Sequence, residues 1–276
     1  MKGVIVTVNY NNCDVTIRFI DSIRILDDFS RISIIIIDNS IKENNSIFLS
    51  KYITDNALQN ITILRSEVNR GYFGAVAYAV SELNFNLNDL DFFIISNNDI
   101  IIEDAEFFTR VNQSIHKSEI VAPCIISLLT QKDQNPYRER EITKLQKLAI
   151  TIYFSNYVIG YISLILWLFK KIISGNSVAK VVSESNIYSG HGSFIILSGD
   201  FFRKGGFIDN RLFLYGEEEF ITAIAKRNSM NIRYMPDIKV FHDEHKTTNS
   251  KKLTRKIYQY QKAAYKFIKR EYPGIY

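Results

Sequence analysis

Short runs of apolar, mostly β-branched residues, each stopping abruptly at a polar cluster, place the strongest constraint on how this chain can fold. In the first third of the chain these runs are 4–8, 32–37, 61–64 and 92–95. Unbroken apolar runs of this length are typical of strands that are buried on both faces. Helical patterns lie between them at 15–26 and 71–83. The alternation predicts an α/β domain with a mostly parallel sheet and helices on both faces.

The polar clusters that end these runs are candidates for a ligand site. They are 9–12, 38–40 and 96–99. In open α/β sheets, ligands bind beyond the carboxyl ends of the strands, which is where these clusters fall. Asp38 follows four isoleucines, and its carboxylate can accept hydrogen bonds from a base or a ribose. A turn cap is the simpler interpretation of this residue taken alone.

The last third of the chain returns to a mixed pattern and completes one core. Its predicted strands are 193–197, 213–215, 232–234 and 239–241. A helix is predicted from 218 to 227, and the tail at 251–272, rich in Lys, Arg and Tyr, is also predicted to be helical. No internal repeat and no low-complexity linker divides the chain.

A stretch without any formally charged residue, 148–169, interrupts this rhythm. Its length alone makes it a transmembrane candidate, but it contains polar residues such as Asn156 and Ser163. A buried helical hairpin, an oligomer contact and a segment resting on a bilayer are the alternatives. A single span would put the candidate site residues Asp99 and Glu218 on opposite sides of a membrane. We therefore expect an interfacial or partner-contacting helical element.

The overall charge and the cysteines limit the binding partners and the cellular compartment that we expect for this protein. A net charge of +5 is compatible with an anionic nucleotide or an anionic membrane face, and no clustered basic stripe suggests nucleic acid. Cys13 and Cys124 show neither zinc spacing nor a disulfide framework, which favours a reducing compartment. Met1 leads into a strand-like run instead of a signal core. We expect a cytoplasmic protein, with the inner face of the cell membrane as a second location.

A glycine-bearing loop at 69–75, NRGYFGA, opens the predicted helix at 71–83. Small residues let the backbone approach a ligand, and the amino end of a helix favours a phosphate group. The loop is not the G-x-G-x-x-G fingerprint of a nicotinamide-binding fold, and nothing like that fingerprint follows the first strand. A dehydrogenase therefore has little support.

Three further groups of residues carry possible chemistry. Asp99 ends a buried strand and can hold Mg²⁺ or Mn²⁺ above a diphosphate, although a polar strand terminus is the plainer interpretation. One of Glu217, Glu218 and Glu219 can act as a general base. Acidic residues in the first turn of a helix also stabilise the helix electrostatically, so they need not have a catalytic function. His242 follows an apolar run and is a candidate inward-facing ligand.

The order of these features resembles that of family 2 glycosyltransferases, and more narrowly the bacterial rhamnosyltransferase-like branch that builds surface polysaccharides. The matching motifs are VTVNYN, IIDNS, NRGYFG, NND, GSFIIL, GGFID, FLYGEE and a late His. They cover residues 3–125 and 187–248 in the order of the family. The resemblance implies a GT-A fold with a Rossmann-like sheet, to which this chain adds a helical apolar insertion that is longer than the family leads us to expect.

The resemblance also implies roles for individual residues. The residues expected to bind the nucleotide sugar are Thr7, Asn9, Asp38, Asn69, Gly71 and Asn97. Asp99 occupies the metal-facing position of a D-x-D-type motif, and His242 is expected to help hold a Mn²⁺ or Mg²⁺ ion or the leaving diphosphate. Glu218 aligns with the catalytic base and Glu217 with its acidic neighbour. Gly192 and Ser193 are expected to border the acceptor.

Two motifs of the family are altered in this chain. Asn97 stands where the family has its first acidic residue, which weakens any claim of tight metal binding. Lys262 and Ala263 stand where many relatives have Arg-Asn. A catalytically silent sugar-nucleotide-binding protein and a nucleotidyltransferase are the competing functions. The first would be expected to lack Glu218 or Asp99, and the second to carry a basic glycine-rich loop where this chain has residues 9–12.

The expected organisation is a single glycosyltransferase domain over 1–276. Its parts are a nucleotide-sugar-binding half at 1–125, an apolar helical insertion at 127–186, an acceptor and catalytic half at 187–248 and a basic C-terminal helix at 249–276. The expected reaction is inverting transfer of a sugar from dTDP-rhamnose or a UDP-sugar to a glycan or lipid-linked acceptor. A membrane surface and a second copy of the chain are further candidate partners.

Overall fold

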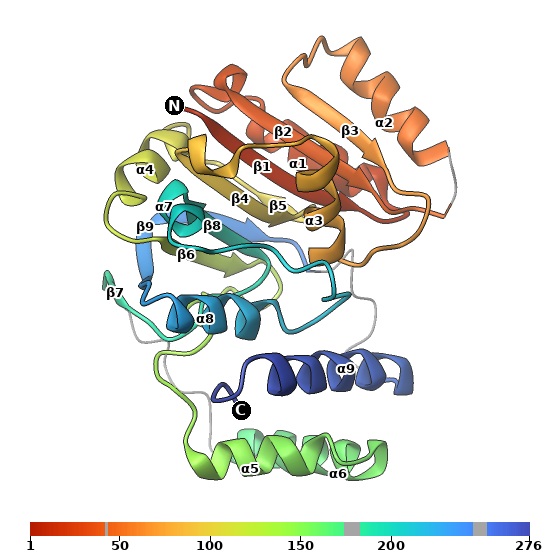
Figure 1. The fold of residues 1–276 in the computed structure, drawn as a ribbon. Coiled ribbons are helices and arrows are strands. Elements are labelled where there is room, and N and C mark those ends of the chain that lie inside the picture. The colour runs from red at the N-terminus through yellow and green to blue at the C-terminus, as the bar shows by residue number, and fades with distance from the viewer. Residues whose placement is uncertain (42–43, 174–182, 245–252) are drawn as a thin grey trace.

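Figure 1 shows a twisted sheet with helices on both faces and a separate helical layer beyond α9. The computed structural model describes residues 1–41, 44–173, 183–244 and 253–276. The strands are β1 (Gly3–Asn9), β2 (Ile32–Asp38), β3 (Ile61–Arg65), β4 (Phe92–Asn97), β5 (Ile100–Ile101), β6 (Ile120–Ser127), β7 (Ser185–Asn186), β8 (Phe194–Ser198) and β9 (Ile232–His242). They form one sheet in the order β3-β2-β1-β4-β8-β6-β9-β5, with β7 paired to β9.

The strands of the first hundred residues are parallel, as predicted. β1 pairs with β2 and β4, and β2 pairs with β3, all in the parallel sense. The later strands are mixed, because β8 runs antiparallel to β4 and β6, whereas β6 and β9 are parallel. The α/β prediction is confirmed, and the antiparallel strand β8 joins the two parts of the sheet.

Helices bury both faces of this sheet. One face is covered by α1 (Cys13–Ile23), α2 (Asn44–Asp55) and α4 (Phe107–Ser114), and the other by α3 (Phe73–Glu82), α7 (Gly199–Arg203) and α8 (Glu217–Arg227). Helix α9 (Arg255–Glu271) lies beyond α8 and extends the core on that side. The isoleucines of β2 alternate between the two hydrophobic cores, with Ile35 and Ile37 in one and Ile34 and Ile36 in the other. This two-sided burial explains why the strand sequences are continuously apolar.

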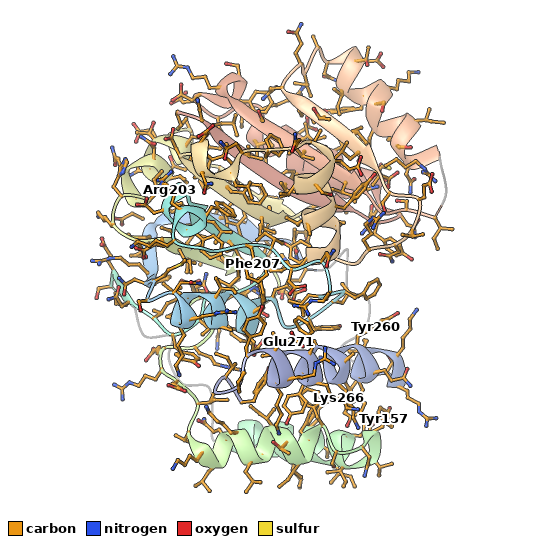
Figure 2. All side chains as sticks on the ribbon, in the orientation of Figure 1. Tyr157, Arg203, Phe207, Tyr260, Lys266 and Glu271 are labelled. Atoms are coloured by element: carbon orange, nitrogen blue, oxygen red, sulfur yellow. The ribbon has the colours of Figure 1, made fainter. Side chains whose placement is uncertain are left out.

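Helices α5 (Lys144–Tyr153) and α6 (Tyr157–Ile173) form the separate layer, which packs against the far side of α9. Tyr157 lies between α6 and α9 (Figure 2), and its hydroxyl donates to the Leu253 carbonyl over 3.2 Å. Gly160 makes room for the Tyr258 ring, since a Cβ there would lie 2.6 Å from a ring carbon. The α5–α6 hairpin therefore depends on aromatic packing against α9.

The charge-free stretch at 148–169 is thus two helices with a break at residues 154–156. In the part of the chain that the structure describes, no helix is both long and apolar enough to span a bilayer. The expected insertion at 127–186 extends into residues 174–182, which lie outside the described residues. Its status as an insertion stays a prediction.

Three predicted strands differ in the structure. The runs 232–234 and 239–241 belong to one strand, β9, whose pairing with β6 shifts in register between Pro123 and Cys124. Residues 213–215 do not form a strand. The backbone carbonyls of Leu212 and Phe213 instead accept hydrogen bonds from the glycine-bearing loop. The amide of Gly74 donates to Leu212, and the amide of Tyr72 donates to Phe213.

This loop contact requires glycine at position 71. Gly71 has a φ of +73°, and a Cβ there would lie 1.7 Å from the carbonyl oxygen of Phe213. The amide of Tyr72 donates a hydrogen bond to the same oxygen over 2.7 Å. The segment that leads into α8 is therefore held against the loop that leads into α3.

We predict that Gly71→Ala lowers the free energy of unfolding by at least ~2 kcal/mol more than Gly274→Ala, because it adds a steric clash to backbone strain. Gly274 is a matched control, since its φ is +107° but a Cβ there would have no neighbouring atom within 4 Å. Urea denaturation of both variants measures the difference. Equal losses would show that the Gly71 contact is dispensable.

Candidate active site

The carboxyl ends of β1, β2 and β4 meet at one edge of the sheet. Asn9 lies opposite Asp38 in the β1–β2 ladder, and Val8 lies opposite Asn97 in the β1–β4 ladder. A pocket of about 440 Å³ opens at this edge. The predicted site residues in its wall are Asn69, Gly71, Asn97, Asp99, Gly192, Ser193, Glu217 and Glu218. The fold thus brings both halves of the predicted site into one cavity.

Thr7, Asn9 and Asp38 do not line the pocket, because they are fully buried behind it. Asn9 donates from Nδ2 to Asp38 Oδ1 over 3.0 Å and accepts at Oδ1 from the Thr16 hydroxyl over 2.8 Å. Among the described residues, Asp38 Oδ2 has no hydrogen-bond partner, and it lies 3.8 Å from an Arg65 nitrogen. These residues support the floor of the pocket, and their direct contact with a nucleoside stays a prediction.

Strand pairing brings Asp99 and His242 together. β5 begins directly after Asp99, and its Ile100 lies opposite His242 at the end of β9. The amide of Asp243 donates to the Asp99 carbonyl over 2.8 Å. As a result His242 Nε2 lies 3.2 Å from Asp99 Oδ1, with both side chains buried. His242 is not in the pocket wall itself but lies directly behind Asp99.

The hydrogen bonds around Gln134 determine which nitrogen of His242 carries a proton. Gln134 donates from Nε2 to Glu244 Oε1 over 2.8 Å, so its Oε1 is the acceptor that faces His242 Nδ1, also at 2.8 Å. Nδ1 must therefore be the protonated nitrogen. Nε2 then faces the Asp99 carboxylate either as an imidazolium N–H or as a bare lone pair.

A bare Nε2 lone pair beside a carboxylate oxygen suits a shared cation. An imidazole nitrogen and a carboxylate oxygen are both metal ligands, and the bond from Nδ1 to Gln134 is the outer contact that orients a ligating histidine. Among the described residues, no group of three or more His, Cys, Asp or Glu side chains could hold a metal ion. A cation here would consequently need further oxygen ligands, such as those of a diphosphate.

The first turn of α8 carries three consecutive glutamates, of which Glu217 and Glu218 line this pocket. Burial is the main cause that raises the pKa of all three carboxyls, and the charge of Glu218 adds to it at Glu217, whose pKa rises to about 8. Glu219 pairs with Arg138 at 2.9 Å. The raised pKa favours the protonated form of Glu217 at neutral pH, and a backbone hydrogen bond from Gly192 favours the ionised form of Glu218.

A second glycine fixes the Glu218 side chain. The Gly192 amide donates to Glu218 Oε1 over 2.9 Å, and a Cβ at position 192 would lie 2.8 Å from the same oxygen. The neighbouring Ser193 carbonyl accepts from the Asn97 amide over 2.8 Å. The loop before β8 thus ties the end of β4 to the carboxylate of α8.

The structure adds three pocket residues that the sequence did not indicate as functional. Tyr72 lines the pocket with a buried hydroxyl that has no hydrogen-bond partner among the described residues. His191 lines it too, and burial followed by the nearby His242 lowers its pKa to about 4. Tyr215 lines it with a left-handed φ of +68°. Tyr72 and Tyr215 lie inside motifs that the sequence singled out, NRGYFG and FLYGEE, whereas His191 had no such signal.

Comparison with solved structures identifies the fold. GalNAc-T7 with UDP, GalNAc and Mn²⁺ matches with a TM-score of 0.59 and 15% identity, over 88% of this chain and 43% of that one. A Pyrobaculum calidifontis mannosyltransferase with GDP-Man and Mn²⁺ matches with 0.55 and 12%, over 89% and 57%. S. aureus TarS 1-349 with UDP-GlcNAc matches with 0.56 and 13%, over 94% and 64%.

These matches are to longer proteins, since the chain spans 43% to 64% of their lengths. No family model and no curated protein sequence matches the chain. At identities of 12% to 15%, the likeness concerns the fold. The fold of this chain is that of the nucleotide-sugar-dependent, GT-A-type glycosyltransferases.

Proposed function

We propose that this protein is an inverting glycosyltransferase that uses a nucleotide-sugar donor. The observation that carries the proposal is the position of Glu218, whose carboxylate lines the same pocket as Asp99. A candidate base and a carboxylate that can hold a cation for a diphosphate, both in one pocket, suit displacement at an anomeric carbon bound there. The similar structures with UDP, UDP-GlcNAc and GDP-Man support a donor of this chemical class.

The donor would lie along the carboxyl edge of the sheet. The nucleoside end would rest above Asp38, and the diphosphate would face Asn97 and Asp99. Asp99 and His242 would hold a Mn²⁺ or Mg²⁺ ion, and the ion would neutralise charge on the leaving diphosphate. The unpartnered Tyr72 hydroxyl is positioned to donate to the donor sugar or to its phosphate.

The chemical step would be a single displacement. Glu218 takes the proton from an acceptor hydroxyl as the oxygen forms a bond to the anomeric carbon. The bond from that carbon to the phosphate oxygen breaks, and the nucleoside diphosphate leaves with the electron pair. The Gly192 amide holds the carboxylate of Glu218 in place, and the protonated Glu217 beside it leaves Glu218 to carry the negative charge. General-base catalysis of this kind contributes ~10²–10⁴-fold.

The finer identity of the reaction is also proposed on the resemblance to the family 2 rhamnosyltransferase-like branch. The donor would be dTDP-rhamnose or a UDP-sugar, and the acceptor a glycan or a lipid-linked sugar in surface polysaccharide synthesis. The apolar face of the α5–α6 hairpin gives the lipid-linked acceptor independent support.

That apolar face favours contact with an anionic membrane surface. Its exposed residues are Leu145, Leu148 and Ile152 on α5, and Val158, Ile162 and Leu166 on α6. Figure 2 shows side chains of this layer pointing away from the body of the protein. Residues 144–166 contain no acidic residue, and the exposed Lys144 adds a positive charge that suits anionic lipid, whereas Lys147 is paired with Glu141 at 3.3 Å.

We predict that Glu218→Gln lowers kcat at least ~10²-fold with donor affinity retained, because the base is lost and the shape is kept. Glu217→Gln should cost less than ~10-fold at neutral pH, since an amide resembles the protonated carboxyl that Glu217 already presents. In the wild type, kcat/KM should fall as the pH drops below the raised pKa of Glu218, because the base must be ionised. Steady-state kinetics over a range of pH measure all three; near-normal turnover by Glu218→Gln would refute the base assignment.

A second prediction concerns the cation. Gln134→Leu removes the partner of His242 Nδ1 and should weaken Mn²⁺ binding in the presence of UDP by ~10–100-fold. Gln131→Leu is the control, since Gln131 is exposed and its side chain bonds only the Leu128 carbonyl among the described residues. Isothermal titration with Mn²⁺ measures both variants. Unchanged affinity in Gln134→Leu would remove His242 from the metal site.

A third prediction tests the membrane face. Leu145→Glu combined with Leu148→Glu should lower binding to phosphatidylglycerol vesicles at least ~10-fold, because it places two negative charges on the apolar surface. The same charges at the exposed residues Ile47 and Phe48 of α2 are the control. Vesicle sedimentation measures the effect. Absence of wild-type binding, or self-association through this face in sedimentation equilibrium, would contradict a membrane role.

A further inference from the structure

A second pocket, of about 360 Å³, adjoins the candidate active site. It lies between α5, the first turn of α8, α9 and the C-terminal Tyr276. Its volume is within the ~300–1,000 Å³ range that small-molecule sites occupy. Two of its wall residues, Tyr215 and Glu218, also line the first pocket. The two cavities therefore meet at the proposed catalytic base.

The backbone at this junction is held in an uncommon conformation. Tyr215 and Gly216 both have a left-handed φ, of +68° and +86°. A left-handed tyrosine is disfavoured by its side chain, and such strain is concentrated at ligand sites in proteins. Here Tyr215 lines both cavities, and the chain turns at Gly216 into α8, whose first turn brings Glu218 into both walls.

The walls of the second pocket are aromatic, and their rings are fixed by mutual packing. Phe154, which follows α5, stacks on Tyr265 of α9, with ring centroids 4.6 Å apart and an angle of 21° between the planes. Tyr276 meets Tyr265 at 4.9 Å. Tyr137 contributes a further, partly exposed ring. Flat aromatic faces offer an apolar surface on which the C–H face of a sugar ring can lie.

Polar groups complete the same cavity. Arg138 and Glu219 form an ion pair at 2.9 Å in its wall, and Glu219 is 6% exposed. Gln261 of α9 adds an amide. Guanidinium, carboxylate and amide groups can together donate to and accept from the hydroxyls of a saccharide. A cavity with aromatic faces and such groups at its edge suits a neutral sugar better than a phosphate or a purely apolar ligand.

We propose that this second pocket is the acceptor subsite and binds a saccharide whose reacting hydroxyl reaches Glu218. The inference rests on the proposed function and deepens it. The acceptor enters from the α5–α9 side, the donor occupies the first pocket, and the hydroxyl proton passes to Glu218 where the two meet. Gly192 and Ser193, which line the first pocket, then border only the reacting end of the acceptor.

The test uses p-nitrophenyl glycosides of the common hexoses and N-acetylhexosamines as acceptor surrogates, followed by saturation-transfer NMR. Gln261→Trp fills the pocket, and Gln259→Trp makes the same change at an exposed position of the same helix. Tyr137→Ala removes one ring at a residue that is 41% exposed, and because that ring also contacts His191 and Arg138, UDP binding serves as the control for the first pocket. Binding of UDP to each variant reports separately on the first pocket.

The proposal predicts that at least one glycoside binds the wild type and Gln259→Trp, and binds Gln261→Trp and Tyr137→Ala at least tenfold more weakly. UDP should neither displace the glycoside nor lose affinity in any variant. Failure of every glycoside to bind the wild type, or undiminished binding in Gln261→Trp, overturns the acceptor subsite. Failure of UDP and nucleotide sugars to bind the wild type overturns the proposed function instead, so the two failures are distinguishable.

Discussion

The close backbone approach between Gly71 and Phe213 is the constraint on which the site depends. No side chain fits at position 71, where a Cβ would lie 1.7 Å from the Phe213 carbonyl oxygen. This contact pins the segment before α8 against the carboxyl edge of the sheet. Two residues later the chain turns through the left-handed Tyr215 and Gly216 into the helix. The position of Glu218 follows from that turn and from the Gly192 amide that holds its carboxylate.

The electrostatic environment gives the ionisable residues around the pocket different charge states. Burial of three adjacent carboxyl groups is costly, and the structure offsets it by placing them at the positive end of α8 and by pairing Glu219 with Arg138. The raised pKa of Glu217 favours its protonated form at neutral pH, and the hydrogen bond from the Gly192 amide favours the charged form of Glu218. Asp99 lines the same pocket, and its pairing with the His242 behind it suits a cation. One cavity thus holds a candidate base and a candidate cation site, which is what transfer of a sugar from an anionic leaving group to a neutral hydroxyl requires.

Much of this arrangement follows from local sequence. The buried strands that stop at Asn9, Asp38 and Asn97 were readable as apolar runs, and parallel pairing alone requires their ends to meet. The remainder depends on tertiary contacts that have no local pattern. The run at 213–215 has the composition of a strand, but the carbonyls of Leu212 and Phe213 accept hydrogen bonds from the glycine-bearing loop instead of from a neighbouring strand. Gln134 orients His242 from more than a hundred residues away, and the second pocket forms only where α5, α8 and α9 converge.

The central claim is that the first pocket binds and activates a nucleotide sugar. The most direct test is donor hydrolysis by the purified chain across a panel of UDP-, GDP- and dTDP-sugars, with Mn²⁺ and with EDTA. The account predicts Mn²⁺-dependent release of nucleoside diphosphate from one donor class, because water can replace the acceptor hydroxyl beside Glu218. Absence of both binding and hydrolysis for every donor would contradict it.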